Sequence, residues 1–500
     1  MQQEQTNPLA TGSIGKLLFR LAIPSITAQI INVLYNMVDR MFIGHIPEIG
    51  AAALTGVGIT FPIITLISAF SYLIGMGGAP LAAIEMGKNN QKQAEKIMGN
   101  CFSALIMISV LLTVFFLSFQ KPLLLFFGAS ENTLAYAIDY LSIYTCGTVF
   151  VQISLGLNTF ITSQGFAKTS MLTVLIGAIL NIILDPIFIF GFNMGVRGAA
   201  LATVFSQCIS AIWVFCFLRG HTTKLKLKKE NLTLQKELIL PILALGISPF
   251  IMQSTESLLT ICLNTSLQKY GGDLAVGAMT ILTSIMQFSM LPIMGLTQGA
   301  QPITSFNYGA KQKQRVKKTV QILLISAFCY TFLLWLLIML FPAFFVKIFT
   351  NSQQLIPFTA WGLRIYMSVS CLMGLQMSCQ QSFIALGKAK VSTFLALLRK
   401  ILLLIPLIYI LPLFFEDKVF AVFLAEPIAD AIAITTTTIL FSVQFKKILA
   451  QLPEMKKMLF YKEISSIKKY DIVDFMGNLW SKTHFIQVFE SRNSSLGIMP

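Results

Sequence analysis

Long hydrophobic runs, separated by short polar stretches, recur along almost the whole chain. The first run, 17–44, carries a polar residue at every third or fourth position, so these side chains share one face of a helix. A carboxylate this far inside an apolar segment is costly unless it faces protein, water or a partner. The pattern therefore predicts a membrane helix with one wet face. The polar positions are Ser25, Gln29, Asn32, Asn36 and Asp39.

Apolar runs of about 20 residues are long enough to cross a bilayer as helices. A membrane β-barrel would instead show short segments of alternating polarity. We therefore expect an all-α polytopic membrane protein with twelve transmembrane helices. The expected spans are 15–44, 53–84, 95–119, 133–164, 167–192, 197–219, 237–268, 274–306, 316–346, 357–385, 391–414 and 419–446.

Composition supports this class, because 55% of the 500 residues are hydrophobic and only 12% are charged. The net charge of +16 invites a nucleic-acid partner, but the positions of the basic residues argue against one. Fifteen Lys and Arg residues follow even-numbered spans and five follow odd-numbered spans. Positively charged loops remain in the cytoplasm, so we expect both termini there and no nucleic acid.

The sequence contains none of the common motifs for catalysis, nucleotide binding or metal binding. The eight cysteines lie in apolar spans without a CxxC pair, and no GxSxG, HExxH or Walker loop occurs. The histidines, His45, His221 and His484, are scattered. We therefore expect no enzyme and no cofactor, and these residues indicate no metal site.

An internal repeat relates the two halves. GAPLAAIEMGKNNQKQAEK at the end of the second span resembles GAQPITSFNYGAKQKQRVKK at the end of the eighth. Pro80 and Pro302 are 222 residues apart (302 − 80), as are Gly87 and Gly309 (309 − 87). Parallel repeats of six spans are one architecture of secondary transporters. We divide the chain into an amino-terminal lobe (1–220), a basic cytoplasmic linker (221–236), a carboxy-terminal lobe (237–449) and a cytoplasmic tail (450–500), in which 455–469 is expected to form an interfacial helix.

Polar residues from three spans of the amino-terminal half are expected at one level. At about 1.5 Å per residue, Asp39, Asp185 and Thr203 each lie roughly 8–10 Å inside the outer end of their span. Asn181 precedes Asp185 by one turn. Oxygen ligands suit Na⁺, and paired carboxylates can carry a proton. The alternative is that each acid is a satisfied buried residue, or that one pairs with Arg40.

The repeat places this chemistry in one half only. At the repeat offsets, Asp39 corresponds to Asn264 and Asp185 to Leu407, so the acids have no counterparts. The carboxy-terminal half instead carries Glu256, for which a functional and a structural role both remain open. Its other buried charges could form a structural ion pair of Arg399 with Glu426, or basic residues that snorkel to the interface. They are Arg399, Lys400, Glu426 and Asp430.

Several motifs resemble the multidrug and toxin extrusion (MATE) family, closest to its DinF-like and MepA-like bacterial branches. They are AIPSITAQIINVLYNMVDRMFIG, NIILDPIFIFG, GVRGAALATVFSQ, QGFAK and LGKAK, in the family's order, and the resemblance covers about 12–446. It implies a twelve-helix antiporter whose two six-helix lobes form a V around a central cavity. Such a protein expels small cationic, often aromatic and amphipathic drugs across the bacterial cell membrane in exchange for H⁺ or Na⁺, and we expect it to act as a monomer in the bilayer.

The resemblance also assigns residues. It places the coupling-cation site at Asp39, Asn181, Asp185 and Thr203, with Tyr35 and Asn158 nearby. Pro24 matches a proline whose bending of the first helix is linked to protonation in the family. Glu256 matches an acid of the NorM-like branch, but the second acid of that branch is absent from SVSCLMGLQM in the tenth span.

Two other functions remain open at this point. A lipid-linked precursor flippase of related architecture would favour a cationic cavity for pyrophosphate, whereas the amino-terminal half offers acids. A membrane scaffold or receptor would use the acids for stability alone.

Overall fold

The computed structural model describes residues 7–453, and these residues form helices and connecting loops without a strand. The described residues up to Leu449 form one compact unit. The predicted interfacial helix over 455–469 lies outside the described residues. The all-α prediction is confirmed.

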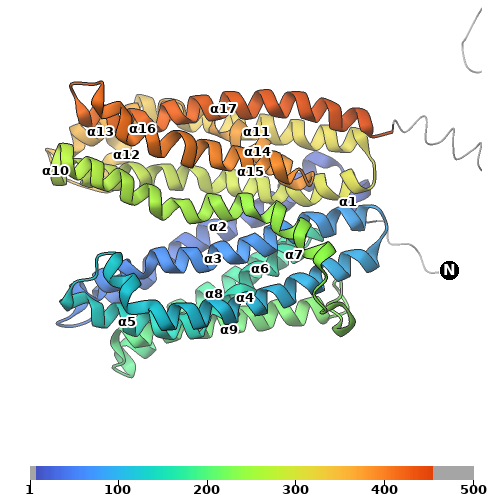
Figure 1. Ribbon diagram of the computed structural model, residues 1–500, viewed down its shortest axis with the longest axis horizontal. Coiled ribbons are helices and arrows are strands. Elements are labelled where there is room, and N and C mark those ends of the chain that lie inside the picture. The colour runs from blue at the N-terminus through green and yellow to red at the C-terminus, as the bar shows by residue number, and fades with distance from the viewer. Residues whose placement is uncertain (1–6, 454–500) are drawn as a thin grey trace, which may run out of the picture. The chain divides into compact units, whose positions relative to one another are not determined.

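The amino-terminal half runs from α1 to α9 (Figure 1). Two of its predicted spans are not straight helices: the fourth bends by 58° within 131–163, and the fifth ends as a π-helix, η1. The elements are α1 (Pro8–Thr11), α2 (Ile14–Gly44), α3 (Gly50–Gly87), α4 (Gln91–Phe126), α5 (Glu131–Cys146), α6 (Thr148–Gly156), α7 (Asn158–Ser163), α8 (Ala167–Pro186), η1 (Ile187–Gly191) and α9 (Gly195–Arg219).

The carboxy-terminal half follows a linker that holds one short 3₁₀ turn, η2 (Lys229–Asn231). Its tenth span is bent by 51°, as the fourth is in the first half. The elements are α10 (Lys236–Gly309), α11 (Lys313–Leu340), α12 (Pro342–Lys347), α13 (Leu355–Tyr366), η3 (Ser370–Leu372), α14 (Met373–Ala385), α15 (Ala389–Leu397), η4 (Leu398–Leu404), α16 (Ile405–Ile410), η5 (Leu411–Leu413) and α17 (Lys418–Gln451).

Twelve spans result when the breaks are counted. Nine segments among the described residues are long and apolar enough to cross a membrane, and two bent pairs pass the same test. The 74-residue helix α10 holds two spans, because Gly272 interrupts it with φ of 61°, a left-handed conformation that favours glycine. The chain is a multi-pass membrane protein whose spans match the predicted ones.

Glycines let α10 approach the amino-terminal half closely. A side chain at Gly246 would collide with the backbone of Leu73 on α3, and one at Gly309 would collide with that of Ile84. Gly299 lies close to Ala22 of α2, where an added Cβ would be 2.6 Å from the backbone nitrogen. Small residues permit such backbone contact between membrane helices. We call this interlobe contact the closed end; it comprises 22–29 of α2, 70–87 of α3, and 242–250 with 295–310 of α10.

The amino-terminal segment, residues 7–12, is hydrogen-bonded to the closed end, and we call it the strap. Arg315 of α11 donates hydrogen bonds to the carbonyl oxygens of Leu9 (3.0 Å) and Gly12 (2.8 Å). Asn307 of α10 also donates to the Leu9 carbonyl, at 3.0 Å. In the linker, Lys224 donates to Asn7 at 2.8 Å, and partial burial lowers the pKa of its ammonium. The strap therefore joins the linker to both halves.

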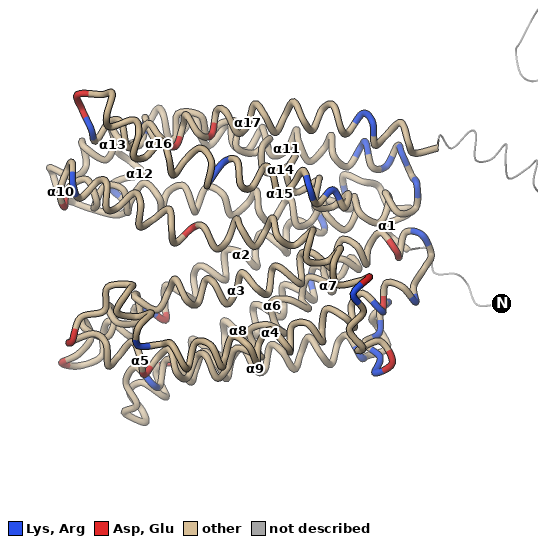
Figure 2. Tube along the Cα trace, viewed as in Figure 1, with Lys and Arg blue, Asp and Glu red and all other residues tan. Residues whose placement is uncertain are grey.

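Among residues 7–453, the close contacts of α2 and α3 with α10 that are described above lie at that end. Along α2, Ala22, Ile26 and Gln29 face α10, and Gln29 hydrogen-bonds to Gln298 at 3.2 Å. Further along the same helical face, Asn36 and Arg40 are exposed. Figure 1 shows the two sets of helices converging towards the end that holds α1. Figure 2 shows that Lys and Arg gather at this end as well.

Replacing Gly246 with Ala should destabilise the closed end. The added methyl meets the Leu73 backbone, which cannot move aside without shifting α3, so we expect a cost of about 1–3 kcal/mol. The measurement is the midpoint of thermal unfolding of the purified full chain in detergent.

Gly58→Ala is the matched control, because Gly58 lies on α3 with no atom within 4 Å of an added Cβ. We expect this variant to be neutral or slightly stabilised, since alanine favours helices. Equal unfolding midpoints for the two variants would contradict the close approach.

Candidate functional site

The four residues predicted to bind the coupling cation come together in the amino-terminal half. Asn181 donates to Asp185 at 3.1 Å, on the same face of α8, and reaches Thr203 of α9 at 3.4 Å. The carboxyl group of Asp39 on α2 lies within hydrogen-bonding range of that of Asp185. Asp39, Asn181 and Asp185 are 8%, 2% and 0% exposed. Three helices therefore converge on one buried polar centre, which we call the acid pair site (Asp39, Asn181, Asp185 and Thr203).

Oxygen atoms at this site have unused hydrogen-bonding capacity. Oδ1 of Asp39, Oδ1 of Asn181 and Oδ2 of Asp185 are buried without a hydrogen-bond partner in the structure. Buried polar atoms normally have partners, because leaving one unpaired costs about 1–3 kcal/mol. Three unpaired oxygens in one place would be satisfied by a proton shared between the carboxylates or by a hard cation such as Na⁺.

Local structure explains how α8 and α9 bring these groups together. Pro186 follows Asp185 directly and removes a backbone donor, and the helix continues as the π-helix η1. The start of α9 packs tightly on this π-helix, because a Cβ at Gly198 would lie 2.7 Å from the Phe188 carbonyl. This close approach places Thr203 beside Asn181.

Tyr140 on α5 is a member of the site that the sequence analysis missed. It is buried, lies within electrostatic range of Asp39 and Asp185, and reaches Thr203 within hydrogen-bonding range. Tyr144, one turn further on, stacks on Tyr140 with ring centroids 6.2 Å apart. The signal was present, since tyrosines recur every four residues in this span, at 136, 140 and 144.

The other predicted participants lie at different distances from the site. Tyr35 is within electrostatic range of Asp39. The guanidinium of Arg40 lies over the Phe61 ring at 5.0 Å and within electrostatic range of Asp39, but the described residues show no salt bridge between the two. Pro24 is buried in α2 near the closed end.

Asn158 does not join the acid pair site. Its side chain accepts a hydrogen bond from Thr173 at 3.1 Å and donates to the Ser170 carbonyl at 3.2 Å. Thr173 lies about 12 Å from Asn181 along α8. In the structure, Asn158 therefore joins α7 to α8.

The carboxy-terminal half holds a separate group of charges. Arg399 of η4 pairs with Glu426 at 2.9 Å and with Asp430 at 2.5 Å, both on α17. The adjacent Lys400 pairs with Glu256 of α10. The side chains of Arg399 and Lys400 are only 14% and 5% exposed, so they are buried ion-pair members and do not snorkel. We call these five residues the carboxyl-lobe charge cluster.

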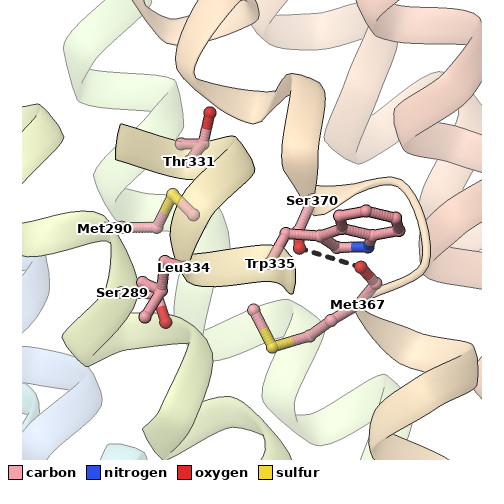
Figure 3. Close-up of a pocket in the computed structure, with 7 residues that line it drawn as sticks. All are labelled: Ser289, Met290, Thr331, Leu334, Trp335, Met367 and Ser370. Atoms are coloured by element: carbon pink, nitrogen blue, oxygen red, sulfur yellow. Dashed lines mark hydrogen bonds between the residues drawn. The ribbon is translucent and has the colours of Figure 1, made fainter. Parts of the chain in front are cut away.

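A small pocket lies at the bend between α13 and η3 (Figure 3). Ser370 donates to the Met367 carbonyl across this bend at 2.8 Å. None of the lining residues is charged, so this pocket offers no carboxylate to a coupling ion. They are Ser289, Met290, Thr331, Leu334, Trp335, Met367 and Ser370.

The repeated six-span halves and the buried acids define a class, that of helical membrane transporters. The MatE family model matches 24–187 and 249–410, two segments whose starts are 225 residues apart (249 − 24), as the repeat requires. The chain belongs to the MATE family, whose members are transporters and not enzymes.

Relatives and solved structures agree with this assignment. The multidrug export protein MepA of Staphylococcus haemolyticus (strain JCSC1435) is 25% identical over 435 residues, which cover 87% of this chain and 95% of the relative. MepA of Staphylococcus aureus (strain MSSA476) is 25% identical over 415 residues, covering 82% and 90%. A structure described as the outward-facing conformation of a multidrug resistance MATE family transporter has a TM-score of 0.83 at 22% identity, covering 90% of this chain and 99% of that chain.

Removing the guanidinium of Arg399 should destabilise the protein strongly. Arg399→Gln leaves Glu426 and Asp430 buried without their cation, and breaking a buried ion pair from one side costs about 3–5 kcal/mol. The measurement is the thermal unfolding midpoint in detergent. Arg364→Gln, at an exposed position of α13, is the control and should unfold like the wild type. A midpoint for Arg399→Gln equal to that of the control would show that the pairing contributes no stability.

Proposed function

We propose that the chain exports cationic amphipathic drugs from a bacterial cell in exchange for H⁺ or Na⁺. The observation that carries this proposal is the acid pair site, where two carboxylates share one buried centre and neither forms a salt bridge within the described residues. The names of the MepA relatives, multidrug export proteins that match over most of this chain, support the substrate class.

Exchange requires that the ion and the drug favour different states of the protein. A cation bound at Asp39 and Asp185 would neutralise their repulsion and draw α2 towards α8. Because α2 also faces α10, this movement would change the space into which a drug binds. Each ligand would weaken the binding of the other by the same factor, as linkage requires.

The distribution of Lys and Arg indicates the orientation of the protein in the membrane. Lys and Arg gather at the closed end, and such residues remain on the cytoplasmic side of the membrane. The closed end and both termini would then face the cytoplasm, and the acid pair site would lie towards the outside. In this state the drug would leave and the coupling ion would enter.

The flippase alternative receives less support. A pyrophosphate group needs basic residues with free charge, but Arg399 and Lys400 are already paired with acids. The exposed member of their cluster is the carboxylate Glu256.

Neutralising either acid should abolish coupled export. We expect Asp39→Asn and Asp185→Asn each to lower the rate of ethidium efflux roughly tenfold or more, because the amide neither releases a proton nor attracts a cation. Efflux is followed by fluorescence, at matched membrane expression, under an imposed proton gradient and separately under an imposed sodium gradient. The gradient that drives wild-type efflux identifies the ion.

Asp273→Asn is the control for the chemical change, since Asp273 is exposed next to the break in α10 and should not affect efflux. Efflux retained in both acid variants would exclude the acid pair site as the coupling centre. No efflux from wild-type cells would reopen the flippase and scaffold functions.

A further inference from the structure

The carboxyl-lobe charge cluster contains more acids than bases. It has three acids, Glu256, Glu426 and Asp430, but two bases, Arg399 and Lys400. With every member ionised the cluster has one excess negative charge. Charges removed from water need compensation, so the cluster favours one additional positive charge.

Only Glu256 can be reached from outside the cluster. Its side chain is 61% exposed, whereas those of Arg399, Lys400, Glu426 and Asp430 are 4–14% exposed. A charged carboxylate within a spanning segment faces water or protein, because exposure to lipid is costly. Any added cation would therefore meet the cluster at Glu256.

The position of Glu256 relates it to the space between the two halves. Phe250 of α10 contacts Phe70 of α3, with ring centroids 5.0 Å apart, at the edge of the closed end. Glu256 lies six residues beyond, about 9 Å along the helix and away from the closed end. On the helix surface it falls between the α3-facing side and the side where Ser248 bonds to Ser392 of α15.

The Glu256 carboxylate already has an ion-pair partner in the structure, the ammonium of Lys400. This ammonium donates a second hydrogen bond to the Met252 carbonyl at 2.9 Å. Lys400 and Glu256 also lie within electrostatic range of Glu426. If another cation took Glu256, Lys400 would keep the Met252 carbonyl, and Glu426 and Asp430 together would balance Arg399 and Lys400.

We propose that Lys400 is a built-in competitor of the exported cation, which binds Glu256 by displacing the Lys400 ammonium. The excess charge of the cluster matches one singly charged substrate, because the exchange leaves both the new pair and the remaining four residues neutral. The carboxy-terminal half thus holds a site for a monovalent organic cation, separate from the acid pair site. The inference rests on the proposed export of cationic drugs, and it assigns to Lys400 the selection of substrates by their charge.

The test uses the purified full chain in detergent and measures the affinities of ethidium, a monovalent cation, and propidium, its divalent analogue. Lys400→Met removes the competitor while keeping the length of the side chain, and ethidium should bind roughly tenfold more tightly. Lys400→Arg keeps the positive charge, and its guanidinium can form two hydrogen bonds to a carboxylate. It should therefore hold Glu256 more tightly, and ethidium should bind several-fold more weakly. Opposite shifts for the two variants are not expected of a purely structural lysine.

Charge selectivity provides a second readout. Lys400→Met leaves two excess negative charges, so its affinity for propidium should rise more than its affinity for ethidium. Glu256→Gln should weaken ethidium binding and remove the effect of Lys400→Met in the double variant. This double variant has no unpaired charge between the two positions, so it tests the proposal even if Lys400→Met alone folds poorly.

Failure of this inference is distinguishable from failure of the proposed function. Unchanged ethidium affinity in Glu256→Gln, or in both Lys400 variants, overturns the competitor role even if wild-type cells export ethidium. The predicted shifts, if they persist in an Asp39→Asn/Asp185→Asn background, support the carboxyl-lobe site even if export is absent. Loss of these shifts in that background would overturn a separate site.

Discussion

The compensation of charge away from water is the constraint on which the interior of this protein depends. The two halves meet it in opposite ways, although they share one repeated plan. Within residues 7–453, the amino-terminal half places Asp39 and Asp185 together without a salt bridge, and one oxygen of each carboxylate is buried without a hydrogen-bond partner. The carboxy-terminal half supplies Arg399 and Lys400 internally. In the part of the chain that the structure describes, Asp39 and Asp185 therefore lack an ion-pair partner, whereas the buried acids of the carboxy-terminal half are paired with basic residues of the same half.

The contact between the halves is of a different kind. At the closed end, Gly246 and Gly309 bring backbone against backbone, which leaves little room for adjustment by side chains. Such a surface fits in one arrangement and loses its contacts when the helices separate. Separation on this side also requires the strap around Leu9 to release Arg315 or to move with it.

Much of this structure could be predicted from the sequence. The apolar runs gave the spans, because burial in lipid leaves an unmistakable length and composition. The estimated depths correctly grouped Asp39, Asp185 and Thr203, since residues at one level on neighbouring helices can meet. Depth does not tell which way a helix is turned. The pairing of Lys400 with Glu256, 144 residues apart, therefore could not be predicted, and neither could the contact of Tyr140 with the site.

The bends of the fourth and tenth spans and the π-helix η4 also escaped prediction, because they depend on neighbouring helices more than on local composition. The amino-terminal strap illustrates a related limit. Arg315 binds the carbonyl oxygens of Leu9 and Gly12, which every residue type provides. These two hydrogen bonds therefore do not depend on the side chains of Leu9 and Gly12, provided that the path of the chain is kept. Substitution of single residues in this segment would leave both bonds available to Arg315, whereas deletion of the segment would remove them together.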